Sequence, residues 1–248
     1  MIMTIAMREL RSMFLSPLAW SVLAVTQLII AWSFFTQIDF FFSIQQQLTT
    51  MPNPPGVTDL VVMPTYEIAS IILLMVTPLL TMRLISEERR NGSMALLLSS
   101  PVSMTQIVLG KFVGIVIFML ILVGMISLMP LSLMMGSTLD LGKLAAGAFA
   151  LFMLLAAFSA AGLFLSSLTV NPVVAAVSSF GLLLLLWIIN SNSGDNGENL
   201  LSQLSILAHF APMLRGLINS ADVAYFVLFI VTFLVLTIRQ MDSQRLQA

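Results

Sequence analysis

The stretch that decides the fold is residues 144–194, LAAGAFALFMLLAAFSAAGLFLSSLTVNPVVAAVSSFGLLLLLWIINSNSG, which contains no Asp, Glu, Lys or Arg. As one α-helix these 51 residues would be about 76 Å long at ~1.5 Å per residue, more than twice the ~30 Å hydrocarbon core of a bilayer. The stretch must therefore fold back on itself, and Asn171-Pro172 is the place where a helix would break. A hairpin of two spanning helices makes the chain a polytopic membrane protein.

The composition supports a membrane protein without a separate soluble domain. Hydrophobic residues make up 59% of the 248 residues and charged residues only 8%, whereas a soluble domain carries ~25% charged residues. No polar stretch is long enough to fold by itself, so we expect a single transmembrane domain over residues 1–248. The chain has no cysteine, which excludes disulfides and thiolate metal sites.

Six apolar runs have the length of a spanning helix, and they predict an all-α membrane fold with six transmembrane helices. They lie at 18–38, 68–85, 112–136, 144–168, 173–190 and 223–238. An even number of spans places both termini on the same side of the membrane.

The basic residues assign that side to the cytoplasm. Eight of the ten lie on it: Arg8, Arg11, Arg83, Arg89, Arg90, Lys111, Arg239 and Arg245. Because cytoplasmic loops carry an excess of Lys and Arg, we expect both termini in the cytoplasm.

The segment 3–15 has the pattern of an amphipathic helix that lies in the cytoplasmic interface. Its apolar residues recur at helical spacing (Met3, Met7, Leu10, Phe14), and its polar residues fall on the other face (Thr4, Arg8, Arg11, Ser12). Ser16-Pro17 would end this helix before the first span. The alternative is a frayed, positively charged terminus.

Two predicted outer loops, 39–66 and 191–221, are longer than a connection needs. The first contains Pro-Asn-Pro-Pro-Gly at 52–56 and reads as extended at its centre. The second becomes apolar again over 200–217, which is too short to span. We expect helical segments there that dip into the outer leaflet.

The loop at 83–111, between the second and third spans, is the most informative. Its charge cluster at 87–90 ends at Asn91-Gly92, a break that tolerates positive φ. A short helix at 93–98 stopped by Pro101 follows, and Ser103 with Gln106 forms a capping box for the next helix. Such a helix on the membrane surface is either a docking surface for a soluble partner or an anchor in the lipid head groups. The residues alone weigh these two alternatives evenly.

This loop resembles that of the ABC-2 type permeases, the six-span transmembrane subunits of bacterial ABC exporters. The matching residues are Glu87, Glu88, Arg89, Gly92, Ser93, Leu97, Pro101, Gly110 and Lys111. Segments 8–20 and 209–226 resemble the gliding-motility-type branch of these permeases. The chain departs from the pattern at Ser93 and Ala95, where the family often has Thr and Glu.

The resemblance implies a bacterial inner-membrane permease that is not an enzyme and binds no cofactor, with ATP and Mg on a separate ATPase subunit. The sequence agrees, because it has no Gly-x-x-x-x-Gly-Lys-Ser/Thr phosphate loop. The implied coupling residues are Glu87, Glu88, Arg89, Arg90, Gly92, Ser93, Leu97, Pro101, Arg8 and Arg11. A second permease chain, identical or different, completes the pathway; a further envelope subunit is a candidate partner, and no nucleic acid is expected.

Features within the spans bear on the substrate and on movement. The spans carry almost no ionisable side chains, which fits an amphiphilic or lipid-like substrate better than a small ion. Pro78 and Pro130 are candidate kinks, and Gly110-x-x-x-Gly114 permits close helix contact.

Other classes of function need residues that the sequence does not offer. An intramembrane zinc protease is excluded because His209 is the only histidine and there is no cysteine. The outer segment with His209, Phe210 and Arg215 is a candidate outer gate, although ordinary packing is the favoured interpretation of His209. A secondary transporter would need inverted repeats, and none is visible. A membrane anchor or mechanotransmission subunit of an ATPase-driven envelope assembly, with no transported solute, stays open.

Overall fold

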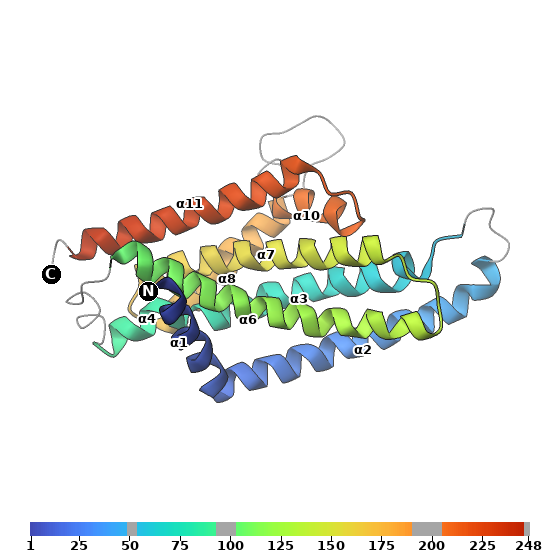
Figure 1. Ribbon diagram of the computed structural model, residues 1–248, viewed down its shortest axis with the longest axis horizontal. Helices are drawn as coiled ribbons and strands as arrows, with labels where there is room; N and C mark the ends of the chain where they lie inside the picture. Colours follow the sequence, from blue (N-terminus) through green and yellow to red (C-terminus); the bar gives the residue numbers. More distant parts are fainter. Residues whose placement is uncertain (49–53, 93–102, 190–204, 246–248) are drawn as a thin grey trace.

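The computed structural model describes residues 1–48, 54–92, 103–189 and 205–245, and in these residues the chain is helical with no β-strand. The helices run roughly along one direction and form an elongated bundle (Figure 1). In chain order they are α1 (Ile2–Leu15), α2 (Pro17–Leu48), the π-helical turn η1 (Thr58–Val62), α3 (Met63–Thr81), α4 (Arg83–Arg90), α6 (Met104–Ser132), the 3-10 turn η2 (Leu133–Met135), α7 (Leu141–Leu168), α8 (Pro172–Ile188), α10 (Ile206–Leu214) and α11 (Ser220–Arg245).

Among the described residues, five stretches of helix are long and apolar enough to cross a bilayer: 17–47, 58–90, 104–135, 141–168 and 220–244. They confirm five of the six predicted spans and the all-α fold. The predicted fifth span, 173–190, corresponds to α8, whose 17 described residues are shorter than the other spans. At ~1.5 Å per residue α8 is about 26 Å long, slightly less than a ~30 Å hydrocarbon core.

Helix α7 is the central element of the bundle. It contacts α3, α6, α8, α10 and α11, and its span is the most buried of the five. Two glycines let α3 approach it closely: a Cβ on Gly147 would lie 2.7 Å from the ring of Tyr66, and one on Gly162 would overlap the Thr81 side chain. The charge-free sequence therefore forms the core because its small residues admit neighbouring helices.

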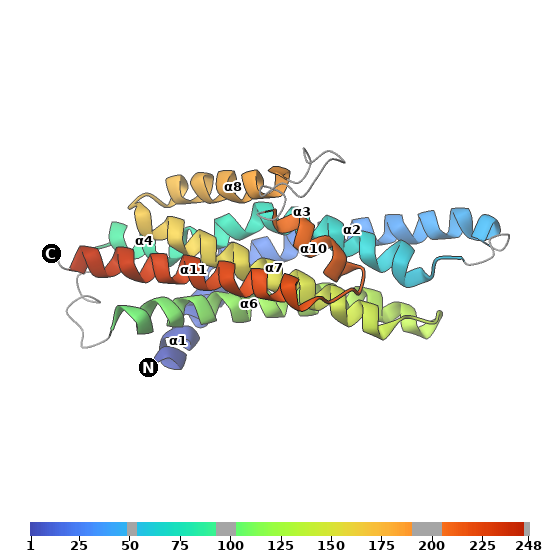
Figure 2. The same ribbon diagram turned by 90° about the horizontal axis from the view of Figure 1, so that it is seen from above.

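Helix α1 and the last turns of α11 lie at the same end of the bundle, the arrangement that an even number of crossings gives (Figures 1 and 2). We call this the basic end; it is formed by α1, α4, the first turns of α6 and the last turns of α11. The opposite end carries the α6–α7 connection and the end of α2. The assignment of the basic end to the cytoplasm stays a prediction from the distribution of charge.

The predicted bounds of the outer loop 39–66 are wrong, because helical structure occupies both ends of that range. Helix α2 continues to Leu48, and helical structure resumes at Thr58. The prediction ended the helix at the first charge, Asp39, but a charge ends an apolar span and does not end a helix. The first proline after Asp39 in the sequence is Pro52.

The second predicted outer loop contains the expected helical segment, α10, at Ile206–Leu214. Gly216, two residues after the end of α10, has a φ of 87°, in the left-handed region that glycine adopts most readily after a helix C-terminus. The first half of that loop, 191–204, lies outside the described residues.

Candidate functional site

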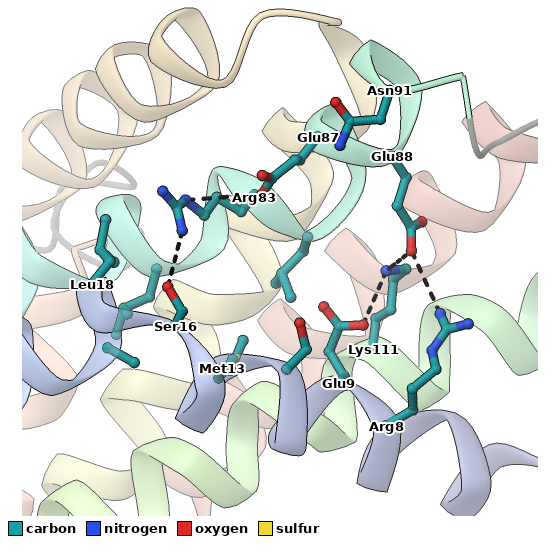
Figure 3. Close-up of a pocket in the computed structure, with 14 residues that line it drawn as sticks. Arg8, Glu9, Met13, Ser16, Leu18, Arg83, Glu87, Glu88, Asn91 and Lys111 are labelled. Carbon is teal, nitrogen blue, oxygen red and sulfur yellow. Dashed lines mark hydrogen bonds and ion pairs between the residues drawn. The ribbon is translucent and has the colours of Figure 1, made fainter.

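A buried lysine joins three helices at the basic end. Lys111, in the second turn of α6, has a side chain that is only 1% exposed. Its Nζ atom lies 2.7 Å from Oε1 of Glu88 on α4 and 3.2 Å from Oε2 of Glu9 on α1 (Figure 3). Arg8 on α1 also reaches Glu88 Oε1, at 3.5 Å. We call Arg8, Glu9, Glu88 and Lys111 the Lys111 cluster.

The Lys111 cluster is balanced in charge, with two cations and two carboxylates. An ammonium group buried without a partner would cost several kcal/mol in lost hydration, and two carboxylates within hydrogen-bonding distance offset that cost. Because Glu9 and Glu88 come from different helices, Lys111 makes both ion pairs only when α1 and α4 are both in place against α6. The cluster is therefore a joint between these helices.

Helix α1 fits against α6 because α6 carries Gly110 and Gly114 there. A Cβ on Gly110 would lie 2.7 Å from the Ile5 Cβ, and one on Gly114 would lie 3.0 Å from the Glu9 Cβ. The Gly-x-x-x-Gly spacing thus does permit a close helix contact, and the partner is α1 of the same chain.

The predicted apolar face of α1 divides between buried and exposed positions. Met3 and Met7 are 64% and 57% exposed, whereas Ala6 is fully buried beside Leu10 and Phe14 of the predicted face. Exposed methionines on a helix at the membrane interface can face lipid, so the interfacial placement of α1 stays a prediction.

One serine of α7 forms hydrogen bonds with the backbone at the start of α4. The helical span 58–90 is interrupted at Met82, four residues after Pro78, and Ser166 of α7 lies opposite the interruption. The Ser166 hydroxyl accepts hydrogen bonds from the backbone N–H groups of Ile85 and Ser86, at 3.2 and 3.1 Å, and donates one to the Met82 carbonyl at 3.0 Å. A break that would leave buried backbone groups unpaired is therefore satisfied from the neighbouring span.

Comparison with protein families identifies the chain. Residues 3–239 match the model of the ABC-2 family transporter protein. The chain belongs to the ABC-2 transporter family. It is accordingly a multi-pass transmembrane subunit of an ABC transporter, and the family implies association with an ABC ATPase subunit. A search of curated proteins gave no match.

The structure places most of the predicted coupling residues of this ABC-2 permease at the basic end. Glu87, Glu88, Arg89 and Arg90 lie on α4, and Arg8 and Arg11 lie on α1. Gly92 has a φ of 70°, which confirms the predicted break after Asn91. The remaining predicted coupling residues, Ser93, Leu97 and Pro101, lie outside the described residues.

The same region shows which residues sequence reasoning missed. Lys111 was a matched family residue without a predicted role, and Glu9 and Ser166 were not singled out. A signal for Lys111 was available, since it is the one charge inside the long apolar helix α6 and it lies between the two glycines. No comparable signal marks Ser166, because serines in spans commonly bond to their own helix.

The candidate outer gate residues do not converge. His209 Nδ1 lies 2.6 Å from Asp222 Oδ1, and its ring stacks on Tyr225 with 4.1 Å between centroids. Phe210 is fully buried and faces Trp187, and Arg215 is exposed. This geometry ties α10 to α11 and agrees with the packing interpretation of His209. Among the described residues no group of His, Asp or Glu is arranged to hold a metal ion.

Proposed function

We propose that this permease is the membrane subunit of a bacterial exporter, and that its basic end receives the movement of a separate ATPase. The observation that carries the proposal is the Lys111 cluster. It fixes two surface elements, α1 and α4, to the spanning helix α6 through one buried lysine.

The residues around the cluster have the exposure that a docking surface needs. Arg11 and Arg90 are exposed, and the Glu87 side chain is 46% exposed. A force on α4 would pass to α6 through Glu88 and Lys111 and to α7 through Ser166. Two spanning helices would then move from one contact, which is how a packed, two-position interface transmits a small displacement.

A tag on the full chain tests this function directly. After mild detergent extraction we expect co-purification of an ABC ATPase subunit, with ATP hydrolysis that depends on the permease. The double variant Glu87→Lys with Arg90→Glu reverses the exposed charges and should abolish that dependence. The control is Asp39→Lys, which changes an exposed acid on α2 near the opposite end. Recovery of the chain alone, with no ATPase activity, would contradict the proposal.

The second candidate function is an anchor or mechanotransmission subunit of an envelope assembly, with no transported solute. The length of α2 favours it: 32 residues extend about 48 Å, which exceeds a ~30 Å hydrocarbon core. Phe40 and Phe42 near its end are exposed, as a contact with a further envelope subunit would require. ATP-dependent uptake of an amphiphile into inverted vesicles would favour the exporter; ATP hydrolysis without any uptake would favour the anchor, as the gliding-motility-type resemblance suggests.

Pairing with a second permease chain is part of the proposal. The spans of α2 and α11 are only 28% and 22% buried, so both present long apolar faces to lipid or to another chain. Chemical cross-linking of the purified complex, followed by mass determination, should give two permease chains for two ATPase subunits.

A further inference from the structure

The basic end contains a cavity to which the coupling role assigns no ligand. It has a volume of about 750 Å³ and lies between α1, the start of α2, and α4. One wall is the Lys111 cluster. The other wall carries Arg83 and Glu87 of α4 together with Ser12 and Ser16 at the end of α1 (Figure 3).

The position of Trp20 indicates that the cavity lies at the depth of the lipid head groups. Its apolar floor comes from the first turn of α2 and the last residues of the α3–α4 region: Leu18, Ala19, Leu80 and Leu84, with Met13 of α1. Trp20, one turn into α2, is 59% exposed and donates its indole N–H to the Phe14 carbonyl at 2.7 Å. An exposed tryptophan at the end of a span marks the membrane–water interface. An apolar floor at this depth with a polar wall suits an amphiphile.

Most N–H donors of the Arg83 guanidinium make no hydrogen bond to the described residues. Its Nη1 donates to the Ser16 hydroxyl at 3.3 Å, and its Nε lies 3.9 Å from Glu87, too far for a hydrogen bond. A guanidinium has five N–H donors, and among the described residues only one of those on Arg83 is engaged. Its side chain is 40% exposed, so it can turn toward a ligand. Guanidinium groups of this kind bind phosphate in a bidentate manner.

The charge of the cavity lining selects among phosphate-bearing amphiphiles. Arg8, Arg83 and Lys111 are balanced by Glu9, Glu87 and Glu88, so the lining is neutral overall. A purely anionic head group would meet three carboxylates. A head group that carries both a phosphate and a primary amine would place the phosphate at Arg83 and Ser16 and the amine at Glu87, whose carboxylate makes no hydrogen bond to Arg83.

We propose that this cavity is a binding site for the head group of a zwitterionic phospholipid of the phosphatidylethanolamine type. Arg83 and Ser16 bind the phosphate, Glu87 binds the ammonium, and the apolar floor receives the first part of an acyl chain. The lipid fills the space between α1 and α4. The proposal does not rest on ATPase coupling, and the test below involves no ATP.

The test measures lipid retained by the full-length chain in native mass spectrometry. Delipidated protein receives phosphatidylethanolamine, phosphatidylglycerol or inorganic phosphate at equal concentrations. We expect retention of phosphatidylethanolamine above phosphatidylglycerol and no displacement by inorganic phosphate. Arg83→Gln should lower the retention about tenfold, as loss of a charge-assisted hydrogen bond implies. Glu87→Gln should remove the preference between the two lipids.

Two further variants keep the test decisive. Arg239→Gln neutralises an exposed arginine of α11 at the same end, outside the cavity lining, and should retain lipid as the unmodified chain does. Ser12→Trp fills the cavity from its rim without removing an ion pair, and it replaces Arg83→Gln if that variant does not fold. Equal retention of phosphatidylethanolamine by the cavity variants would overturn the site. Equal retention of phosphatidylglycerol, or displacement by inorganic phosphate, would overturn the zwitterionic assignment.

Discussion

At the scale of single residues, the glycines of α6 differ in what a side chain would meet. A Cβ on Gly110 would collide with Ile5, whereas a Cβ on Gly124 of the same helix has no atom within 4 Å. The first glycine is therefore required by the contact with α1, and the second is a position where glycine only weakens the helix.

Gly110→Ala should consequently loosen α1, at a cost of about 1–3 kcal/mol of packing energy. Gly124→Ala should be neutral or stabilise α6 by about 0.5–1 kcal/mol. Because the chain has no cysteine, Ala6→Cys gives a single thiol in the buried face of α1. Maleimide should label that thiol faster in the Gly110 variant than in the Gly124 variant; equal rates would show that α1 does not depend on this contact.

Ser166 offers a second comparison between neighbours. It bonds three backbone groups of the α3–α4 break, whereas the equally buried Ser167, within the part of the chain that the structure describes, bonds only the Phe164 carbonyl of its own helix. Ser166→Ala should lower the unfolding free energy by about 1–3 kcal/mol, because buried N–H groups lose their acceptor. Ser167→Ala should cost less than ~1 kcal/mol. Thermal unfolding in detergent compares them, and a reversed order of stability would contradict the role of Ser166.

At the scale of elements, the two glutamates of α4 separate packing from docking. The Glu88 side chain is 19% exposed and pairs with buried Lys111, whereas Glu87 is 46% exposed and its pair with Arg83 is loose. Glu88→Gln should destabilise the chain by about 1–3 kcal/mol, because Lys111 loses the nearer of its two carboxylates and keeps Glu9. Glu87→Gln should cost at most ~1 kcal/mol. The melting temperatures of the two variants check this; similar losses would mean that α4 is not held through Glu88.

The elements also show what sequence patterns can predict. The break at Gly92 and the start of α6 at Ser103, whose hydroxyl accepts from the Gln106 N–H at 3.3 Å, follow from local chemistry and were predicted. The buried face of α1 was not predicted, because it depends on Gly110 and Gly114, about a hundred residues away in the sequence. The Lys111 cluster also depends on residues far apart in the sequence, since Glu9 and Glu88 meet only in the folded bundle.

At the scale of the whole molecule, hydropathy locates the helices along the chain. It does not predict how they pack around α7. The central place of α7 follows from Gly147 and Gly162, whose partners lie on α3. The orientation in the membrane, in contrast, is a prediction from charge alone.

That orientation can be measured with single cysteines at the two ends. Ser12 on α1 and Thr138 between α6 and α7 are both exposed and lie at opposite ends of the bundle. A membrane-impermeant maleimide should label Thr138→Cys from the outer side of the cytoplasmic membrane, and Ser12→Cys only after that membrane is opened. The reverse pattern would place the basic end outside.

The most direct test of the central claim is the ATPase activity of the purified permease–ATPase complex with Lys111 changed. Lys111→Met should unlink α1 and α4 from α6 and abolish the dependence of ATP hydrolysis on the permease, while Lys143→Met, which breaks the 2.6 Å pair with Asp59 at the opposite end, should preserve it. If Lys111→Met does not fold, the triple variant with Glu9→Gln and Glu88→Gln leaves no buried charge unpaired and should fold uncoupled. Unchanged permease-dependent hydrolysis in the folded variant would contradict the claim that Lys111 joins the ATPase-facing helices to the spans.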